Sequence, residues 1–86
     1  DLIILDEPTR GIDVKTKSEI HKLMSELAKR GKAILMVSSE MGEILGMSDR
    51  IVVLHEGEQM ITLKREEADA NIIMQYAMGK KEAVVA

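Results

Sequence analysis

The sequence predicts an α/β fold: parallel strands joined by a crossover helix, followed by a C-terminal β-hairpin and helix. Two short apolar runs without alternation, residues 2–5 and Ala33–Val37, indicate buried strands. Between them, apolar residues recur with the period of an amphipathic helix of about 17 residues. A strand, a helix and a strand in this order form a parallel unit with a right-handed crossover.

The first strand ends in a dense polar motif. Asp6 and Glu7 follow the apolar run directly, and Pro8 prevents further pairing because it has no N–H to donate. An apolar run without alternation fits a strand covered on both faces, but two full helices and one short helix can hardly cover three such strands. Gly11 then allows a turn into the helix.

The first helix has recognisable start and stop signals. Asp13 is its candidate N-cap, with a carboxylate able to accept from the amides of Lys15 or Thr16. Gly31 can take the left-handed conformation that ends many helices. Four apolar residues form one stripe that we expect to face the sheet: Ile20, Leu23, Met24 and Leu27.

The second half of the chain predicts a short helix, a hairpin and a last helix. Ser39 is a candidate cap for the short helix, whose inward residues are Met41, Ile44 and Leu45. Residues 51–55 and 59–63 flank a three-residue connection that contains Gly57, which is typical of a hairpin. Asp69 is a candidate cap for the last helix, which ends before Gly79 and whose inward residues are Ile72, Ile73, Tyr76 and Ala77.

Composition excludes several function classes. Apolar residues make up 45% and charged residues 31% of the 86 residues, and the net charge of -3 leaves no basic excess for nucleic acid. The longest apolar run, Ala33–Val37, is far shorter than the roughly 20 residues that span a bilayer. Without cysteine there is no disulfide or thiolate metal site, so reduced cytosol is the expected compartment. We expect the chain to be a cut piece, because it begins at Asp1 with its densest motif.

Asp6 and Glu7 are the strongest candidates for chemistry. They stand at the carboxyl end of a parallel strand, where α/β folds bind their ligands. Nucleotide hydrolysis uses such a pair, because one carboxylate holds the hydration shell of Mg²⁺ while the other orients and deprotonates the attacking water. By itself, an apolar run followed by two acidic residues is explained about as well by a strand end that is exposed to solvent as by a hydrolytic site.

The extended motif LIILDEPTRGID resembles the Walker B motif and D-loop of an ATP-binding cassette (ABC) ATPase. VSSEM resembles the switch-loop strand of that family, and SDRIVVLHEGE resembles its next strand and hairpin. Within the family, the sequence looks most like the second cassette of the twin-cassette ATPases that energise bacterial monosaccharide importers. The resemblance implies that residues 1–79 are the C-terminal part of a P-loop (RecA-like) nucleotide-binding domain, with residues 80–86 as a disordered tail.

The resemblance also implies roles for individual residues. Asp6 would be the carboxylate that reaches Mg²⁺ through its water ligands, and Glu7 the catalytic base. The D-loop would be Gly11, Ile12 and Asp13, which crosses the interface of two cassettes; Asp13 is equally explained as a helix cap, and the two roles are compatible. Ser39 falls at the switch position, where most cassettes have a histidine that reaches the γ-phosphate. Alternatively, Ser39 caps the short helix, and this role would explain the residue without any contact to a phosphate.

The resemblance implies ATP and Mg²⁺ as cofactors, yet the chain has no GxxxxGK[ST] frame, no LSGGQ-type signature and no aromatic residue in the adenine position. We therefore expect the isolated piece to be inactive.

The implied partners are the rest of its own cassette, the first cassette, the permease subunits and, indirectly, a sugar-binding protein. The implied location is the cytoplasmic face of the bacterial inner membrane, as a peripheral subunit.

Two other functions stay open. A degenerate cassette would bind ATP and regulate without turnover, which Ser39 favours and Glu7 disfavours. A Mg²⁺-binding receiver-like domain would use Asp6 and Glu7 as an acidic pocket, but it would need a further aspartate at a later strand end.

The strand order of the family gives an expectation that coordinates can test. Residues 2–5 should pair in parallel with Ala33–Val37, and residues 51–54 should pair with their hairpin partner. The strand that leads into the P-loop is expected between Ala33–Val37 and residues 51–54, leaving a gap of about 10 Å, or two inter-strand spacings, in its absence.

Overall fold

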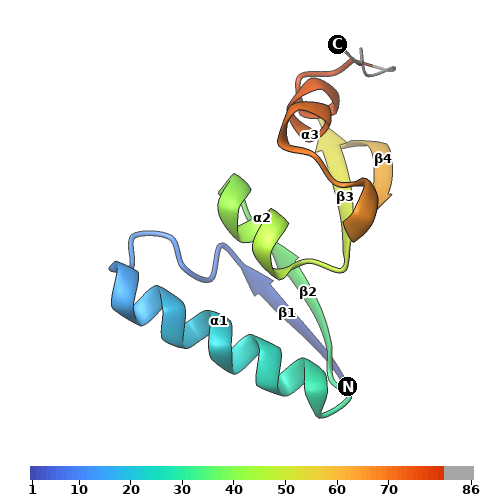
Figure 1. The fold of residues 1–86 in the computed structure, drawn as a ribbon. Helices are drawn as coiled ribbons and strands as arrows, with labels where there is room; N and C mark the ends of the chain where they lie inside the picture. The colour runs from blue at the N-terminus through green and yellow to red at the C-terminus, as the bar shows by residue number, and fades with distance from the viewer. Residues whose placement is uncertain (81–86) are drawn as a thin grey trace. The chain divides into compact units, whose positions relative to one another are not determined.

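The computed structural model describes residues 1–80, so residues 81–86 of the expected tail lie outside the described part. The chain divides into two compact units, Asp1–Glu40 and Met41–Ala86. Its elements are, in order, β1 (Leu2–Asp6), α1 (Val14–Lys29), β2 (Ala33–Val37), α2 (Met41–Met47), β3 (Arg50–His55), β4 (Glu58–Lys64), a 3₁₀ turn (Arg65–Glu67) and α3 (Ala70–Ala77) (Figure 1). This content confirms the predicted α/β class. None of the helices in residues 1–80 is long and apolar enough to cross a membrane.

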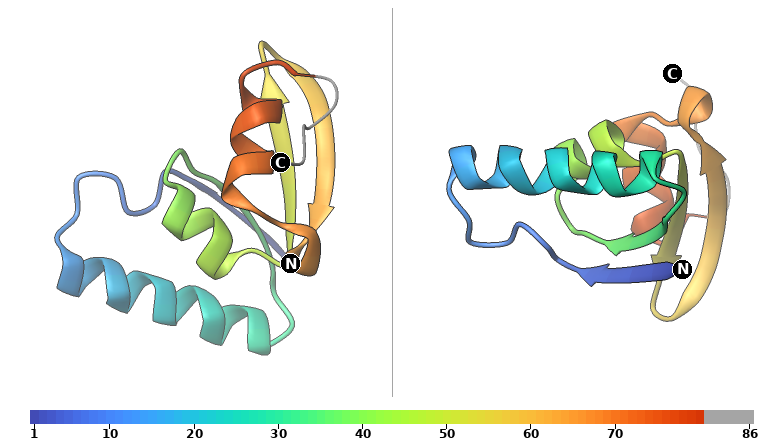
Figure 2. Two further views of the ribbon diagram at one scale, coloured as in Figure 1. Left: turned by 45° about the horizontal axis from the view of Figure 1, so that its top comes forward. Right: turned by 90° about the horizontal axis from the view of Figure 1, so that it is seen from below.

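The first unit is a strand, a helix and a strand. β1 and β2 pair in parallel, in a register that runs from Leu2 opposite Ala33 to Asp6 opposite Val37. α1 connects them, packs against β2 and lies along one side of the two strands in both views of Figure 2. The predicted parallel pairing is therefore confirmed.

The apolar runs fit strands covered on both faces, but in the described chain the two strands are covered on one face only, as the small number of predicted helices indicated. Alternate residues of both strands are half-buried on the covered face, whereas the opposite face exposes an apolar group of side chains at 51–63%. This exposed sheet face consists of Leu2, Ile4, Leu35 and Val37. The reason is that α1 is the only helix of the unit, and one helix can cover only one face.

α1 begins and ends as predicted. Asp13 Oδ1 accepts from the backbone N–H of Thr16 at 2.8 Å. At the other end, the N–H groups of Gly31 and Lys32 bond back to the carbonyls of Ala28 and Leu27, which is a Schellman motif with Gly31 at φ +87°. Of the predicted stripe, Met24 is buried and both Ile20 and Leu27 are half-buried, but Leu23 is 55% exposed. Leu23 lies about 100° around the helix from Met24, which turns it off the covered face.

The second unit has its own core. Ile51 and Val53 of β3, Leu63 of β4 and Ile73 of α3 are buried together. The predicted inward residues of α2 and α3 pack around them: Met41, Ile44, Leu45, Ile72, Tyr76 and Ala77. The placement of these helices by apolar pattern is therefore confirmed.

The hairpin pairs as predicted, with a tighter turn. β3 and β4 are antiparallel, and His55 pairs with Glu58, so the connection has two residues rather than three. Glu56 and Gly57 both have positive φ, 48° and 80°, as in the type I′ turn that two-residue hairpins favour. β3 and β4 form a sheet separate from that of β1 and β2 within the described residues. The gap of about 10 Å expected beside Ala33–Val37 stays a prediction.

α3 is capped at both ends. Asp69 Oδ1 accepts from the backbone N–H groups of Asn71 and Ile72, which confirms the predicted cap. Gly79, at φ +93°, and Lys80 close a second Schellman motif by donating to the carbonyls of Tyr76 and Gln75. Lys80, the first residue of the expected tail, is thus bonded to the last turn of α3.

Candidate functional site

Glu7 stands directly beyond the end of β1 in a left-handed backbone conformation. Its N–H continues the parallel ladder by donating to the carbonyl of Val37 at 2.7 Å, and its own carbonyl accepts from Arg10 in a turn. Its φ is +48°, a region that a non-glycine residue occupies at a cost of about 1–2 kcal/mol. Strained backbone of this kind occurs preferentially at functional sites. The conformation therefore supports a functional role for Glu7 beyond that of a solvated strand end.

Ser39 comes to the same place from the end of β2. Its backbone N–H donates to Oε2 of Glu7 at 3.3 Å, so the structure brings together the two residues predicted to be catalytic. Oε1 of Glu7 has no protein partner within residues 1–80. One carboxylate oxygen is thus held by the protein while the other can accept from a water molecule.

The capping interpretation of Ser39 is wrong. The hydroxyl that accepts a backbone bond at this point belongs to Ser38, which receives the N–H of Glu40 at 3.1 Å. The residue one position later, Ser39, is exposed, and its hydroxyl has no partner in the described part of the chain. Ser38 makes this bond at the spacing of two residues that is common when a serine hydroxyl bonds to a nearby backbone group, and Glu40 directly precedes α2.

Asp6 is the last residue of β1 and is paired with Val37. Its side chain is exposed at the carboxyl end of the strand. Residues 1–80 contain no group of three or more acidic, histidine or cysteine side chains that could hold a metal ion, so the described carboxylates do not form an ion cage by themselves.

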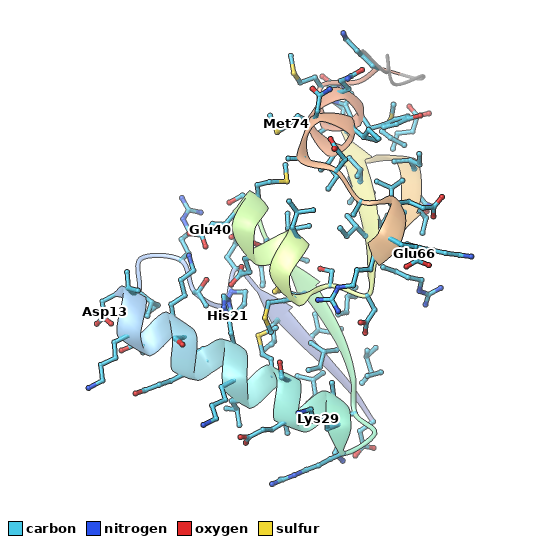
Figure 3. All side chains as sticks on the ribbon, viewed as in Figure 1. Asp13, His21, Lys29, Glu40, Glu66 and Met74 are labelled. Atoms are coloured by element: carbon cyan, nitrogen blue, oxygen red, sulfur yellow. The ribbon has the colours of Figure 1, made fainter. Side chains whose placement is uncertain are left out.

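Gly11, Ile12 and Asp13 form the exposed turn that leads into α1. Gly11 has φ +75°, and the N–H of Ile12 bonds to the carbonyl of Thr9 at 3.2 Å. Ile12 is 41% exposed. Asp13 lies at the start of α1, labelled in Figure 3, and the N–H of Thr16 bonded to its carboxylate lowers the pKa of Asp13. The turn keeps its side chains accessible while Asp13 acts as the cap.

Three residues near the site were missed by sequence reasoning. Glu40, labelled in Figure 3, accepts at Oε2 from the hydroxyl of Thr9 at 3.3 Å and from Nζ of Lys17 at 2.5 Å. Thr9 is only 1% exposed and is the most deeply buried side chain in the described part. The only sequence signal for Thr9 and Glu40 was their position, since Thr9 follows Pro8 in the motif and Glu40 follows Ser39, the candidate switch residue.

Comparison with known proteins identifies close relatives. No protein-family model matches the chain. A ribose/galactose/methyl galactoside import ATP-binding protein of Geobacillus kaustophilus is 62% identical over 80 residues, which are 93% of this chain and 16% of that protein. A ribose import ATP-binding protein of Oceanobacillus iheyensis is 60% identical over 78 residues, 91% of this chain and 16% of that protein. A ribose import ATP-binding protein of Streptococcus agalactiae is 59% identical over 80 residues, which are 93% of this chain and 16% of that protein.

Over 91–93% of its length the chain is similar to a segment of these sugar-import proteins, which supports the predicted resemblance to the family of ABC transporter ATPases. The chain spans about one sixth of the length of the curated relatives it matches.

Proposed function

We propose that this chain supplies the Walker B carboxylates, the D-loop and the switch segment of an ATP-hydrolysing subunit that drives monosaccharide import. The single observation that carries the proposal is the contact between Glu7 and Ser39, N···O 3.3 Å. It joins the candidate base to the candidate switch residue across two loops that are 32 positions apart in sequence. The names of the relatives, which refer to ribose and galactose import, support the sugar class.

Glu7 acts as the general base in this proposal. Its left-handed backbone and the N–H of Ser39 fix the carboxylate in one orientation. A base must lie within hydrogen-bond reach of the water that it deprotonates, and the oxygen without a protein partner offers that position. The N–H of Ser39 therefore orients Glu7 while leaving its second oxygen for water.

The other residues take the roles that the family resemblance implies. Asp6 would hold water ligands of Mg²⁺, and the bound ion would neutralise charge on the phosphates. The exposed turn of Gly11, Ile12 and Asp13 would reach the opposing cassette. The hydroxyl of Ser39, exposed and without a partner in residues 1–80, would face the nucleotide's terminal phosphate.

The chain contributes only part of a nucleotide site. Its sequence contains no phosphate-binding P-loop and no LSGGQ-type motif. The carboxylates that it does contribute have the chemistry required of a Walker B strand end, but nothing in the sequence would cradle the phosphates. We therefore expect the isolated 86-residue chain to have no ATPase activity and no saturable binding of MgATP at millimolar nucleotide.

The proposal also implies partners and a location. The residues would function together with the rest of their cassette, a first cassette and transmembrane permease subunits, and indirectly with a sugar-binding protein outside the membrane. The subunit would lie at the cytoplasmic face of the bacterial inner membrane, held there by the permease. Nucleic acid is not an expected partner, because the net charge of -3 offers no attraction to a phosphate backbone.

One observation favours a second candidate, a degenerate cassette that binds ATP and regulates without turnover. Ser39 is short and uncharged, whereas the histidine of most cassettes can carry a positive charge toward the phosphate. The receiver-like alternative has no such support, because β2 is followed by Ser38 and Ser39 rather than by an aspartate.

A paired substitution in the full-length protein, with the first cassette silenced, tests the proposed function. Glu7→Gln should keep ATP binding and reduce ATP turnover by about 10² to 10⁴-fold, as for a lost general base. The matched control is Glu19→Gln on the exposed side of α1, which should leave turnover unchanged. Unchanged steady-state ATPase in the Glu7→Gln variant would remove Glu7 from its role, and no turnover in the native protein would favour the degenerate cassette.

A further inference from the structure

One carboxylate oxygen joins three segments of the first unit. Oε2 of Glu40 accepts from Thr9 in the turn after β1, at 3.3 Å, and from Lys17 in α1, at 2.5 Å. Glu40 itself belongs to the segment after β2. The carboxylate thus connects the Walker-B-like turn, the helix that follows the D-loop, and the switch segment.

The bond from Thr9 distinguishes this cluster from an ordinary surface ion pair. The side chains of Lys17 and Glu40 are 31% and 39% exposed, so solvent screens their attraction and the pair alone would contribute little. Thr9, however, is 1% exposed, and a buried hydroxyl requires hydrogen-bond partners. A bond to a charged acceptor is also stronger than one between neutral groups. Glu40 therefore holds the buried Thr9 in the turn after β1, which the solvent-screened ion pair with Lys17 could not do by itself.

The cluster bears directly on the candidate site because of its position in the chain. Glu40 follows Ser39, whose N–H contacts Glu7, and Thr9 lies two residues after Glu7. Consecutive Cα atoms are only 3.8 Å apart, so fixing Thr9 and Glu40 limits how far Glu7 and Ser39 can separate. Beside the 3.3 Å bond from Ser39 to Glu7, the bond from Thr9 to Glu40 is a second side-chain bond between these two segments.

We propose that Glu40 is a positioning residue, which holds the switch segment against the turn after β1 and thereby keeps Ser39 in contact with Glu7. The inference rests on the proposed function of Glu7 as the general base. Lys17 contributes by orienting the Glu40 carboxylate from α1. In this role Glu40 acts through Ser39 and Glu7 and not on the nucleotide itself, so its removal should alter the rate of hydrolysis and not the binding of ATP.

The test uses steady-state kinetics of the full-length protein with the first cassette silenced. Glu40→Gln and Lys17→Met should each lower kcat for ATP hydrolysis about 10-fold or more, since small misplacements of catalytic groups can cost up to about 10²-fold, with KM for ATP changed less than about twofold. The control is Lys32→Met. It removes the other lysine ion pair of this unit, between Lys32 and Asp1 at 2.8 Å, and should leave kcat and KM unchanged.

A double-substitution cycle separates positioning from a general structural effect. If Glu40 acts through Glu7, Glu40→Gln should lower the residual kcat of the Glu7→Gln variant by less than about twofold, because coupled residues are not additive. A purely structural role would lower kcat by the same factor in both backgrounds and would overturn the proposal. If Glu40→Gln fails to fold, Lys17→Met still decides the question, in the native and in the Glu7→Gln background.

The failures of the two proposals are distinguishable. If Glu7→Gln abolishes turnover while folded Glu40→Gln and Lys17→Met variants keep the native kcat, the positioning role alone is overturned. If Glu7→Gln keeps the native turnover, the proposed function fails and the positioning role fails with it.

Discussion

The backbone N–H of Ser39 donates to Oε2 of Glu7 at 3.3 Å, and this bond joins the two strand ends of the first unit. It is made by the main chain, so it does not depend on the side chain at position 39. The Ser39 hydroxyl is therefore available for another purpose, whereas the neighbouring hydroxyl of Ser38 accepts the N–H of Glu40. The two adjacent serines thus have separable roles.

The first prediction compares these serines in the full-length protein. Ser39→Ala should change the free energy of unfolding by no more than about 0.5 kcal/mol, as for surface substitutions that break no bond. It should nevertheless lower ATP turnover if its hydroxyl faces the phosphate. Ser38→Ala should cost about 1 kcal/mol, because it removes the acceptor of the Glu40 N–H.

Chemical denaturation and steady-state ATPase assays measure both effects. Equal loss of stability in the two variants would contradict the assignment of the structural bond to Ser38. Full turnover in Ser39→Ala would show that the hydroxyl has no part in hydrolysis.

The second prediction concerns the pH dependence of the α1 cap. The N–H of Thr16 lowers the pKa of Asp13 below the value of about 3.9 that it has in the unfolded chain. A lowered pKa means that the cap contributes its full stability above about pH 4 and loses it as the pH falls through the folded-state pKa. Asp13→Asn is the matched control, because asparagine also caps helices but does not titrate.

The measurement is the difference in unfolding free energy between native protein and the Asp13→Asn variant from pH 6 to pH 2. The native protein should lose stability relative to the variant only in the acidic part of this range. If the difference in unfolding free energy were constant throughout this pH range, Asp13 would not cap the helix as a charged carboxylate.

The third prediction concerns Gly79 at the end of α3. A Cβ on Gly79 would lie 2.8 Å from Nε2 of His55, whose Nδ1 is 2.9 Å from the carbonyl of Ala77. Gly31 also has positive φ but nothing within 4 Å of its Cβ position. Both Gly→Ala substitutions should cost about 1–2 kcal/mol through the left-handed backbone. Gly79→Ala should cost about 1–3 kcal/mol more, through crowding of a packed site.

Thermal and chemical denaturation of the two alanine variants test this difference. The additional cost at Gly79 should largely disappear when His55→Ala is introduced in the same chain. Equal destabilisation by the two substitutions would mean that the imidazole moves aside without cost.

Local signals in the sequence predicted the helix caps at Asp13 and Asp69 and the parallel strand pairing, although the cap predicted at Ser39 was wrong. Asp13 and Asp69 were recognisable because a short acidic side chain before an apolar-periodic segment has one dominant use. The parallel pairing of β1 with β2 followed from the order strand, helix, strand. These features depend on residues close in sequence or on general rules of chain topology.

Other features could not be predicted because they depend on contacts between distant residues. Glu40 reaches Thr9 across 31 positions, and no local pattern indicates that pair. The choice of Ser38 over Ser39 as acceptor depends on the exact direction of the chain after β2. An apolar run alone does not indicate which face of a strand stays uncovered, although exposed apolar strand surface was expected because the few predicted helices cannot cover both faces of three strands.

The last prediction concerns that exposed sheet face of Leu2, Ile4, Leu35 and Val37. Ile4 lies directly opposite Leu35 in the parallel register, and both side chains are more than half exposed, at 63% and 52%. Apolar surface and unpaired strand edges promote association, so the isolated 86-residue chain should aggregate at micromolar to millimolar concentration. Replacing both residues with threonine should raise the soluble concentration, because threonine has the β-branched shape that suits a strand and adds a hydroxyl.

The matched control is the double threonine variant of Ile3 and Ile34, which are also opposite each other but half-buried on the covered face. It should lower the free energy of unfolding, because it removes apolar side chains from the covered side. Sedimentation and light scattering report association, and chemical denaturation reports stability. A native chain that stays monomeric over this concentration range, or a control pair that improves solubility as much as Ile4→Thr with Leu35→Thr, would show that this face does not drive association.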